Sequence, residues 1–128
     1  FEELMDFVKT ARFERLGAFT YSPEEGTKAA KMPNQIDEET KTRRLDQLMM
    51  LQQEISMDKS ERLVGKEIEV IIEGKASDEG VYVGRSYMDA PSVDGYVFIN
   101  SEEELMSGDF AKVRIVKAME YDLIGELI

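Results

Sequence analysis

Apolar positions in the first 21 residues follow first a helical and then a strand-like spacing. Between residues 1 and 12 they recur at i, i+3, i+4, i+7 and i+10, which predicts an amphipathic helix with one apolar face: Phe1, Leu4, Met5, Val8 and Ala11. Residues 13–21 carry aromatic side chains in the alternating pattern of a strand, and residues 22–26 have the composition of a turn. A helix that leads into a strand and a polar loop is expected of an α/β sheet or barrel, where ligands bind at the carboxyl ends of strands.

A long connecting helix is predicted from Asp37 to about Arg62. Asp37 is a favourable N-cap, and acidic residues follow it in the first turn, where the helix dipole stabilises them. One stripe of the helix is apolar but is interrupted by the polar Gln52, and basic residues occupy the wetter side: Leu45, Leu48, Met49 and Ile55 against Lys41, Arg43 and Arg44. A stripe this short and broken favours a helix packed on its own protein over a coiled-coil partner.

From Gly65 onward the pattern is that of short strands. Seven of the nine glycines lie in this half, between segments rich in β-branched residues. The segment Glu67–Ile72 begins with strict alternation of polar and apolar positions, and Lys112–Val116 alternates likewise, so each segment is expected to have one wet and one buried face. We expect five strands, near Glu67–Glu73, Val81–Tyr87, Tyr96–Ile99, Phe110–Ala118 and Asp122–Glu126. Five short strands with tight turns predict a small OB-like antiparallel β-barrel, whose closure would leave no exposed edge.

The composition narrows the chemistry that the chain can support. It has no cysteine and no histidine, so thiolate nucleophiles, disulfides, imidazole bases and the usual zinc, haem and iron–sulfur ligands are absent. The spacing of acidic residues does not match a calcium-binding loop, and no metal site is expected. Apolar runs are too short to span a membrane, and we expect a cytoplasmic protein without a signal peptide.

Charge is divided unevenly between the two halves. Residues 63–128 hold six basic and fourteen acidic residues, a net charge of −8, whereas residues 1–62 hold ten basic and thirteen acidic residues, a net charge of −3. A phosphate backbone would be repelled by the more acidic half, and a basic protein would be attracted to it.

Three segments resemble the radical-SAM methylthiotransferase family. Residues 13–27 (Phe-x-Arg-x-Gly-Ala-Phe-x-Tyr-Ser-x-Glu-Glu-Gly-Thr) resemble the last strand and loop of its catalytic barrel. Residues 33–43, followed by Leu48, Gln52, Ile55 and Ser56, resemble its linker helix, and the polar Gln52 is part of that match. Residues 84–95 (Gly-Arg-Ser-x-x-Asp-Ala-Pro-x-x-Asp-Gly) resemble a loop of its C-terminal TRAM domain.

The resemblance covers nearly the whole chain and implies an α+β fragment of a larger enzyme. Residues 1–36 would be the terminal helix and strand of the radical-SAM (β/α) barrel, residues 37–63 the linker helix, and residues 64–128 the TRAM β-barrel. The parent would use S-adenosylmethionine and two iron–sulfur clusters. Since this chain has no cysteine, the cluster ligands would lie elsewhere in the same polypeptide, and the chain alone would be inactive.

Within the family, the resemblance is closest to the branch that methylthiolates an aspartate of a basic small-subunit ribosomal protein. The tRNA-modifying branch tends to have Arg-Pro where this chain has Glu24 and Glu25, and the net charge of −8 also disfavours tRNA. A nucleic acid is therefore the less favoured partner. The alternative is an RNA-binding TRAM module of a tRNA-adenosine methylthiotransferase, with aromatic residues stacking on bases: Tyr82, Tyr87, Tyr96 and Phe98.

Two groups of residues are candidates for a site, and neither is predicted to be catalytic. The first is a stiff, acidic surface loop expected to contact the substrate protein: Arg85, Asp89, Ala90, Pro91 and Asp94. The second lies where the predicted strand would end, and is expected to line the end of the catalytic barrel: Tyr21, Ser22, Glu24, Glu25 and Thr27. Turn formation and ordinary solvation are the competing interpretations for both groups.

Overall fold

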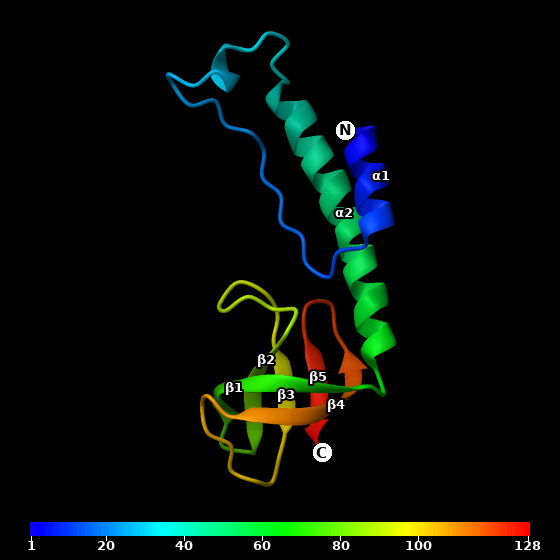
Figure 1. The fold of residues 1–128 in the computed structure, drawn as a ribbon, viewed down its shortest axis with the longest axis vertical. Coiled ribbons are helices and arrows are strands. Elements are labelled where there is room, and N and C mark those ends of the chain that lie inside the picture. The colour runs from blue at the N-terminus through cyan, green and yellow to red at the C-terminus, as the bar shows by residue number, and fades with distance from the viewer.

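The computed structural model describes all 128 residues and shows two regions joined by one long helix (Figure 1). Helix α1 (Glu2–Ala11) lies beside the first half of α2 (Glu38–Leu63). The chain between them contains no strand, and its only regular element is one short 3-10 helix, η1 (Ala29–Lys31). Helix α2 leads directly into a β-barrel that ends the chain. Neither α1 nor α2 combines the length and the apolar character that a membrane-crossing helix requires.

Five strands close the barrel in the order β1-β2-β3-β5-β4, which confirms the predicted five-stranded barrel. They are β1 (Glu67–Ser77), β2 (Val81–Ser86), β3 (Val97–Asn100), β4 (Phe110–Ala118) and β5 (Leu123–Leu127). Strand β1 extends beyond its predicted end and pairs with both β2 and β4. Its register with β2 shifts twice, and such bulges bend a strand enough for it to serve two sides of a small barrel.

The prediction of an entirely antiparallel barrel is wrong at one pair of strands, because β3 and β5 run parallel. The reason is geometric: in a closed ring with an odd number of strands, neighbours cannot alternate in direction all the way round. The other four pairs are antiparallel. The single parallel pair follows from the loop that carries the chain from β3 past the barrel end to β4, beside β1.

The barrel has a core of its own. Alternation is as predicted in β4, where Val113 and Ile115 are fully buried while Lys112 and Arg114 face solvent. The buried residues of the barrel form one cluster: Val70, Ile72, Tyr82, Val97, Ile99, Ala111, Val113, Ile115 and Leu123. Leu63, at the end of α2, packs against this cluster, so the long helix is anchored on the barrel.

The N-terminal region buries much less. Its core is Val8 of α1 with Leu48 and Ile55 of α2. Of the apolar face predicted for the first helix only Val8 is buried, and large apolar side chains nearby remain in solvent: Phe7 is 58% exposed and Phe19 is 96% exposed.

The predicted N-cap of the long helix is confirmed. The side chain of Asp37 accepts hydrogen bonds from the backbone N–H of Thr40, at 2.8 Å, and from its hydroxyl, at 2.9 Å. These bonds favour the ionised carboxylate, first of all the bond from the backbone N–H, and hold the pKa of Asp37 below its ordinary value.

Two predictions for the N-terminal region are wrong. Residues 13–21 are extended but form no strand, because no neighbouring strand offers backbone hydrogen bonds to them. Lys41, expected on the wet side of the long helix, has a largely buried side chain, because its ammonium group donates to the carbonyl oxygen of Tyr21 and to the Glu38 carboxylate. In both cases side chains of α2, and not a neighbouring strand, donate hydrogen bonds to the backbone of the extended segment.

Candidate functional site

Side chains of α2 hold the extended segment in place. Gln52 donates from Nε2 to the carbonyl oxygen of Phe13, at 2.7 Å, and to Ser56 Oγ, at 2.8 Å. Ser56 Oγ in turn donates to the carbonyl oxygen of Glu14, at 2.9 Å. Lys59 Nζ donates to Glu14 Oε1 at 2.6 Å, and this hydrogen bond is the main cause that holds the pKa of Glu14 below its ordinary value. The polar Gln52 therefore completes the backbone hydrogen bonds of a chain that has no strand beside it.

A buried ion pair joins this segment to the barrel. Arg15 contacts Asp89 Oδ1 from Nε at 2.9 Å and from Nη2 at 2.7 Å. The other oxygen of Asp89 accepts from Ser86 Oγ, at 2.6 Å, at the end of β2. The Asp89 side chain is only 2% exposed. The prediction that Asp89 lies on the surface is therefore wrong, because the carboxylate is covered by a residue 74 positions earlier in the chain.

The other residues of the predicted acidic loop either face solvent or take part in local hydrogen bonds. Ala90 and Pro91 are exposed, and the backbone N–H of Ala90 donates to Asp94 Oδ2 at 2.7 Å. Arg85 lies on the barrel wall, where its Nε donates to Glu73 Oε1 at 2.8 Å. The structure brings Asp89, Ala90, Pro91 and Asp94 together, whereas Arg85 has a separate partner.

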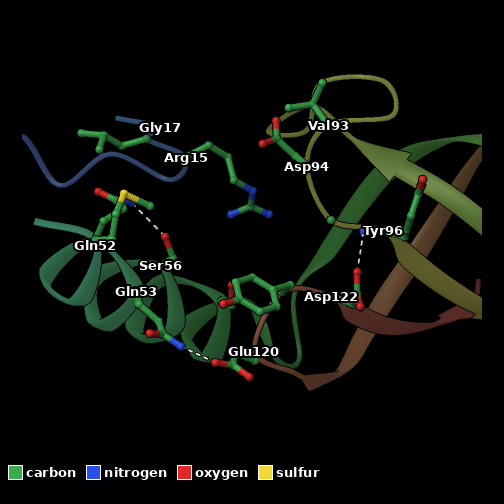
Figure 2. A pocket seen from close by; sticks show the side chains of 15 residues that line it. Arg15, Gly17, Gln52, Gln53, Ser56, Val93, Asp94, Tyr96, Glu120 and Asp122 are labelled. Carbon is green, nitrogen blue, oxygen red and sulfur yellow. Dashed lines mark hydrogen bonds between the residues drawn. The ribbon is translucent and has the colours of Figure 1, made fainter. Parts of the chain in front are cut away.

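A cleft of about 550 Å³ lies where the extended segment, α2 and the barrel meet (Figure 2). Its walls come from residues 15–17, from one face of α2, from the β2–β3 loop and from the β4–β5 turn. The lining contains three carboxylates, Asp94, Glu120 and Asp122, and one cation, Arg15. Because Arg15 is already paired with Asp89, the cleft carries an excess of negative charge.

The second predicted group lies far from this cleft, at the other end of α2 (Figure 1). Tyr21 is held by Lys41, whose Nζ lies 2.9 Å from the Tyr21 carbonyl oxygen and 5.6 Å from the ring centroid. Thr27 Oγ1 donates to the carbonyl oxygen of Glu24 at 2.8 Å and closes a turn. The side chains of this group face solvent: Tyr21, Ser22, Glu24, Glu25 and Thr27. Of this group, only Tyr21 borders a hollow, an open one of about 380 Å³ that it shares with residues 29–36 and with Lys41 and Arg44 of α2.

The residues of this chain do not fit an iron–sulfur cluster. The chain has no cysteine, and no three side chains of the carboxylate type come close enough together to hold a metal ion. The donor groups of this chain are carboxylates, hydroxyls and amides, whereas iron–sulfur clusters are held by thiolates.

Several residues of the cleft could not be found by sequence reasoning. Glu120 and Asp122 belong to a turn of ordinary composition, and only the closure of the barrel brings them opposite α2. Arg15 and Gln52 did carry a signal, since both stand within segments that resemble a known family. Their roles as anchors of the extended segment follow from the structure alone.

Comparisons with known proteins agree with this architecture. Residues 64–128 match the family model described as TRAM domain. The chain is also similar to proteins named ribosomal protein uS12 methylthiotransferase RimO. The one from Pelotomaculum thermopropionicum is 54% identical, over 100% of this chain and 29% of the relative. Those from Lachnoclostridium phytofermentans and Clostridioides difficile are 52% and 48% identical, over 97% and 100% of this chain and 28% and 29% of the relative.

The chain thus spans less than a third of the length of these relatives. The resemblance to methylthiotransferases, predicted from three motifs, is confirmed over the whole chain. The closed five-stranded barrel and the matching family model coincide in the same half of the sequence. Through residues 64–128, this chain belongs to the TRAM domain family.

Proposed function

We propose that this chain is the C-terminal segment of an enzyme that methylthiolates an aspartate of the small-subunit ribosomal protein uS12, and that its barrel recognises that protein. Relatives about half identical to the chain carry the name of that activity. Three motifs in the same order support the assignment independently of overall identity. Such an enzyme would work in the cytoplasm, where ribosomal proteins are made.

The observation that carries the proposal is the charge of the barrel half. Residues 63–128 have a net charge of −8, and the loops that face the cleft add carboxylates without adding free cations. A surface of this kind raises the association rate of a basic protein and lowers that of RNA, whose phosphates it repels.

Residues 1–36 are proposed to be the end of a radical-SAM barrel completed by the rest of the same polypeptide. The exposed Phe7 and Phe19, and the extended segment without a strand partner, are what an incomplete α/β unit would leave uncovered. S-adenosylmethionine and two iron–sulfur clusters would then bind outside this chain, and the chain alone would be inactive. The exposed group around Tyr21 and Glu24 would line the end of that barrel.

Within the acidic loop, the contacts divide the proposed roles. Ala90, Pro91 and Asp94 are proposed to contact uS12, since they are at least partly accessible. Asp89 is proposed to position the loop, because its carboxylate is covered by Arg15. Arg85 is held by Glu73 and would take part only if the partner displaced that bond.

One observation favours the alternative, an RNA-binding TRAM module. Tyr87 is largely exposed beside the acidic loop and could stack on a base. The other aromatic candidates are less suited: Tyr82 is buried in the core, and Tyr96 and Phe98 pack edge to face on each other with centroids 6.4 Å apart.

The proposal is tested by titrating the 128-residue chain with purified uS12 and, separately, with tRNA, each at low and at physiological salt. We expect binding to uS12 that weakens with salt, and much weaker binding to tRNA. An unrelated protein of similar positive charge is the control for specificity. Tighter binding to tRNA than to uS12 would contradict the proposal and support the alternative.

A further inference from the structure

The barrel and the rest of the chain share little apolar packing. Their two buried clusters have no residue in common, and within α2 only Leu63, in its last turn, packs on the barrel core. Helix α2 enters β1 through Gly65, which has a positive φ of 86°. Farther along the helix, the cleft of about 550 Å³ separates α2 from the loops of the barrel. Contacts other than core packing are therefore needed to hold the barrel at one angle to α2.

Two side-chain contacts cross from the N-terminal region and α2 to the barrel. One joins Gln53 of α2 to Glu120 and lies in solvent, where water competes for the same hydrogen bond. The other joins Arg15 to Asp89, whose side chain is only 2% exposed. Figure 2 shows Arg15 extending from its segment into the gap between α2 and the barrel. The Arg15–Asp89 pair is thus the buried connection between the two regions.

The position of Arg15 is fixed by α2. The carbonyl oxygen of Glu14 accepts from Ser56 Oγ at 2.9 Å and from Arg15 Nη1 at 3.0 Å. The side chain of Glu14 is held by Lys59 at 2.6 Å, and Leu16, on the other side of Arg15, packs against the N-terminal core. One nitrogen of the guanidinium group is therefore bound to backbone that α2 holds in place, while its two other nitrogens meet the barrel.

The position of Asp89 is fixed by the barrel. Its second oxygen accepts from Ser86 Oγ at 2.6 Å, and Ser86 is the last residue of β2 and is 3% exposed. Met88 packs against the barrel core, and its backbone N–H donates to Ser86 Oγ at 3.2 Å. The acidic loop continues directly from Asp89 to Asp94. A series of hydrogen bonds therefore leads from α2, through Arg15, to the base of the acidic loop.

We propose that Arg15 and Asp89 are positioning residues, which hold the barrel and its acidic loop at one orientation to the N-terminal region. A planar guanidinium group that contacts a carboxylate through two nitrogens fixes direction as well as distance. The consequence for activity rests on the proposed function: uS12 bound at the acidic loop would be presented at a fixed place to the rest of the enzyme. The pair would then serve turnover more than affinity.

The direct test measures the orientation of the barrel in the 128-residue chain. The chain has no cysteine, so Glu39→Cys in α2 and Lys75→Cys in β1, both at exposed positions, carry two spin labels. Double electron–electron resonance gives the distribution of distances between them. We expect one narrow distribution, and one at least about twofold wider after Arg15→Gln or Asp89→Asn. Unchanged widths in both folded variants would overturn the proposal, because a pair that only stabilises the fold would not alter them.

Three further variants make the measurement specific. Arg114→Gln removes an exposed arginine paired with Glu67 inside the barrel and should leave the width unchanged. Arg15→Lys keeps the charge, but one ammonium group cannot make all three contacts, so the width should be intermediate; this milder change also serves if a neutral variant fails to fold. Arg15→Gln combined with Asp89→Asn should be no wider than either variant alone. Additive widening would contradict a role as one pair.

Kinetics of the full-length enzyme tests the consequence for activity. We expect Arg15→Gln to lower kcat for uS12 by about tenfold and to change KM by less than about threefold. A rise in KM with kcat unchanged would overturn the role in presenting uS12. Failure of the unmodified enzyme to act on uS12 would contradict the proposed function, and the distance measurement would then decide on the Arg15–Asp89 pair by itself.

Discussion

The barrel and the N-terminal region differ in how far each buries its own apolar side chains and completes its own backbone hydrogen bonds. The barrel closes on itself, leaves no edge strand and buries a core of nine residues. The N-terminal region buries three, leaves Phe19 in solvent, and relies on side chains of α2 for the hydrogen bonds of its extended segment. The barrel thus has a core of its own, whereas the N-terminal region leaves apolar side chains uncovered, as expected if it packs against the rest of a larger enzyme as proposed.

The largest effect is expected from the barrel core. Ile99 is fully buried in β3, and Ile99→Ala should lower the free energy of unfolding by about 4 kcal/mol, through lost burial and the cavity left behind. The counterpart in the other region is Phe19→Ser, which should change it by less than about 0.5 kcal/mol because Phe19 touches little. Chemical denaturation followed by circular dichroism measures both. Similar losses of unfolding free energy in the two variants would contradict the difference in packing between the two regions.

A second large effect is expected where the barrel packs backbone against backbone. A Cβ added at Gly95 would lie 1.7 Å from the carbonyl oxygen and 2.9 Å from the carbonyl carbon of Tyr121, and backbone cannot move aside as a flexible side chain can, so Gly95→Ala should cost about 3 kcal/mol. Gly74 lies in β1, where an added Cβ meets nothing within 4 Å, and Gly74→Ala is the matched control. Thermal unfolding of both variants tests this. A stable Gly95→Ala chain would mean that the turns of the barrel yield more easily than its closed core implies.

The junction between the regions should give an intermediate effect. Asp89→Asn keeps the shape of the side chain and removes the charge that balances Arg15. Breaking a buried ion pair typically costs about 3–5 kcal/mol, and we expect about 2 kcal/mol here because Arg15 keeps a quarter of its side chain in water.

Hydrogen exchange shows which part of the chain Asp89→Asn destabilises. The amides of residues 87–95 should exchange faster in Asp89→Asn, while those of β4 should change little. Asp94→Asn, in the same loop but outside the ion pair, is the control. Equal behaviour of the two variants would show that the Arg15–Asp89 pair does not fix the loop.

The smallest effect is expected at the start of α2 and depends on pH. The folded-state pKa of Asp37 is lowered by its bonds to Thr40, so its contribution is complete above the ordinary aspartate pKa and is lost as the pH falls through the folded value. Asp37→Asn keeps a capping side chain that does not titrate. The difference in denaturation midpoint between the two chains should therefore change below about pH 4 and stay constant above it. A difference in midpoint that stays constant over the whole pH range would contradict the stabilisation of ionised Asp37 by its bonds to Thr40.

The barrel could be predicted from the sequence because each strand is defined by a pattern within a few neighbouring residues. Strict alternation in β1 and β4 and glycine at the turns define strands one at a time, and closure follows from their number. The parallel pairing of β3 with β5 was missed, since it depends on the order of strands around the ring and not on any one of them.

The N-terminal region and the site were harder because their contacts are long-range. Alternating aromatic residues predict extended chain in residues 13–21, and the chain is extended, but a strand also needs a neighbour. The burial of Asp89 depends on Arg15, 74 residues away, and the cleft depends on four separate segments. The acidic character of the barrel half could be predicted from the sequence, but which of its carboxylates line the cleft could not.

The central claim, that the acidic barrel recognises a basic protein, is tested most directly by mapping uS12 onto the chain through amide chemical shifts. The account predicts that the perturbed amides lie in residues 64–128, with the largest shifts around Ala90, Pro91 and Asp94. Perturbations concentrated in α1 and residues 12–36, with the barrel unchanged, would contradict it.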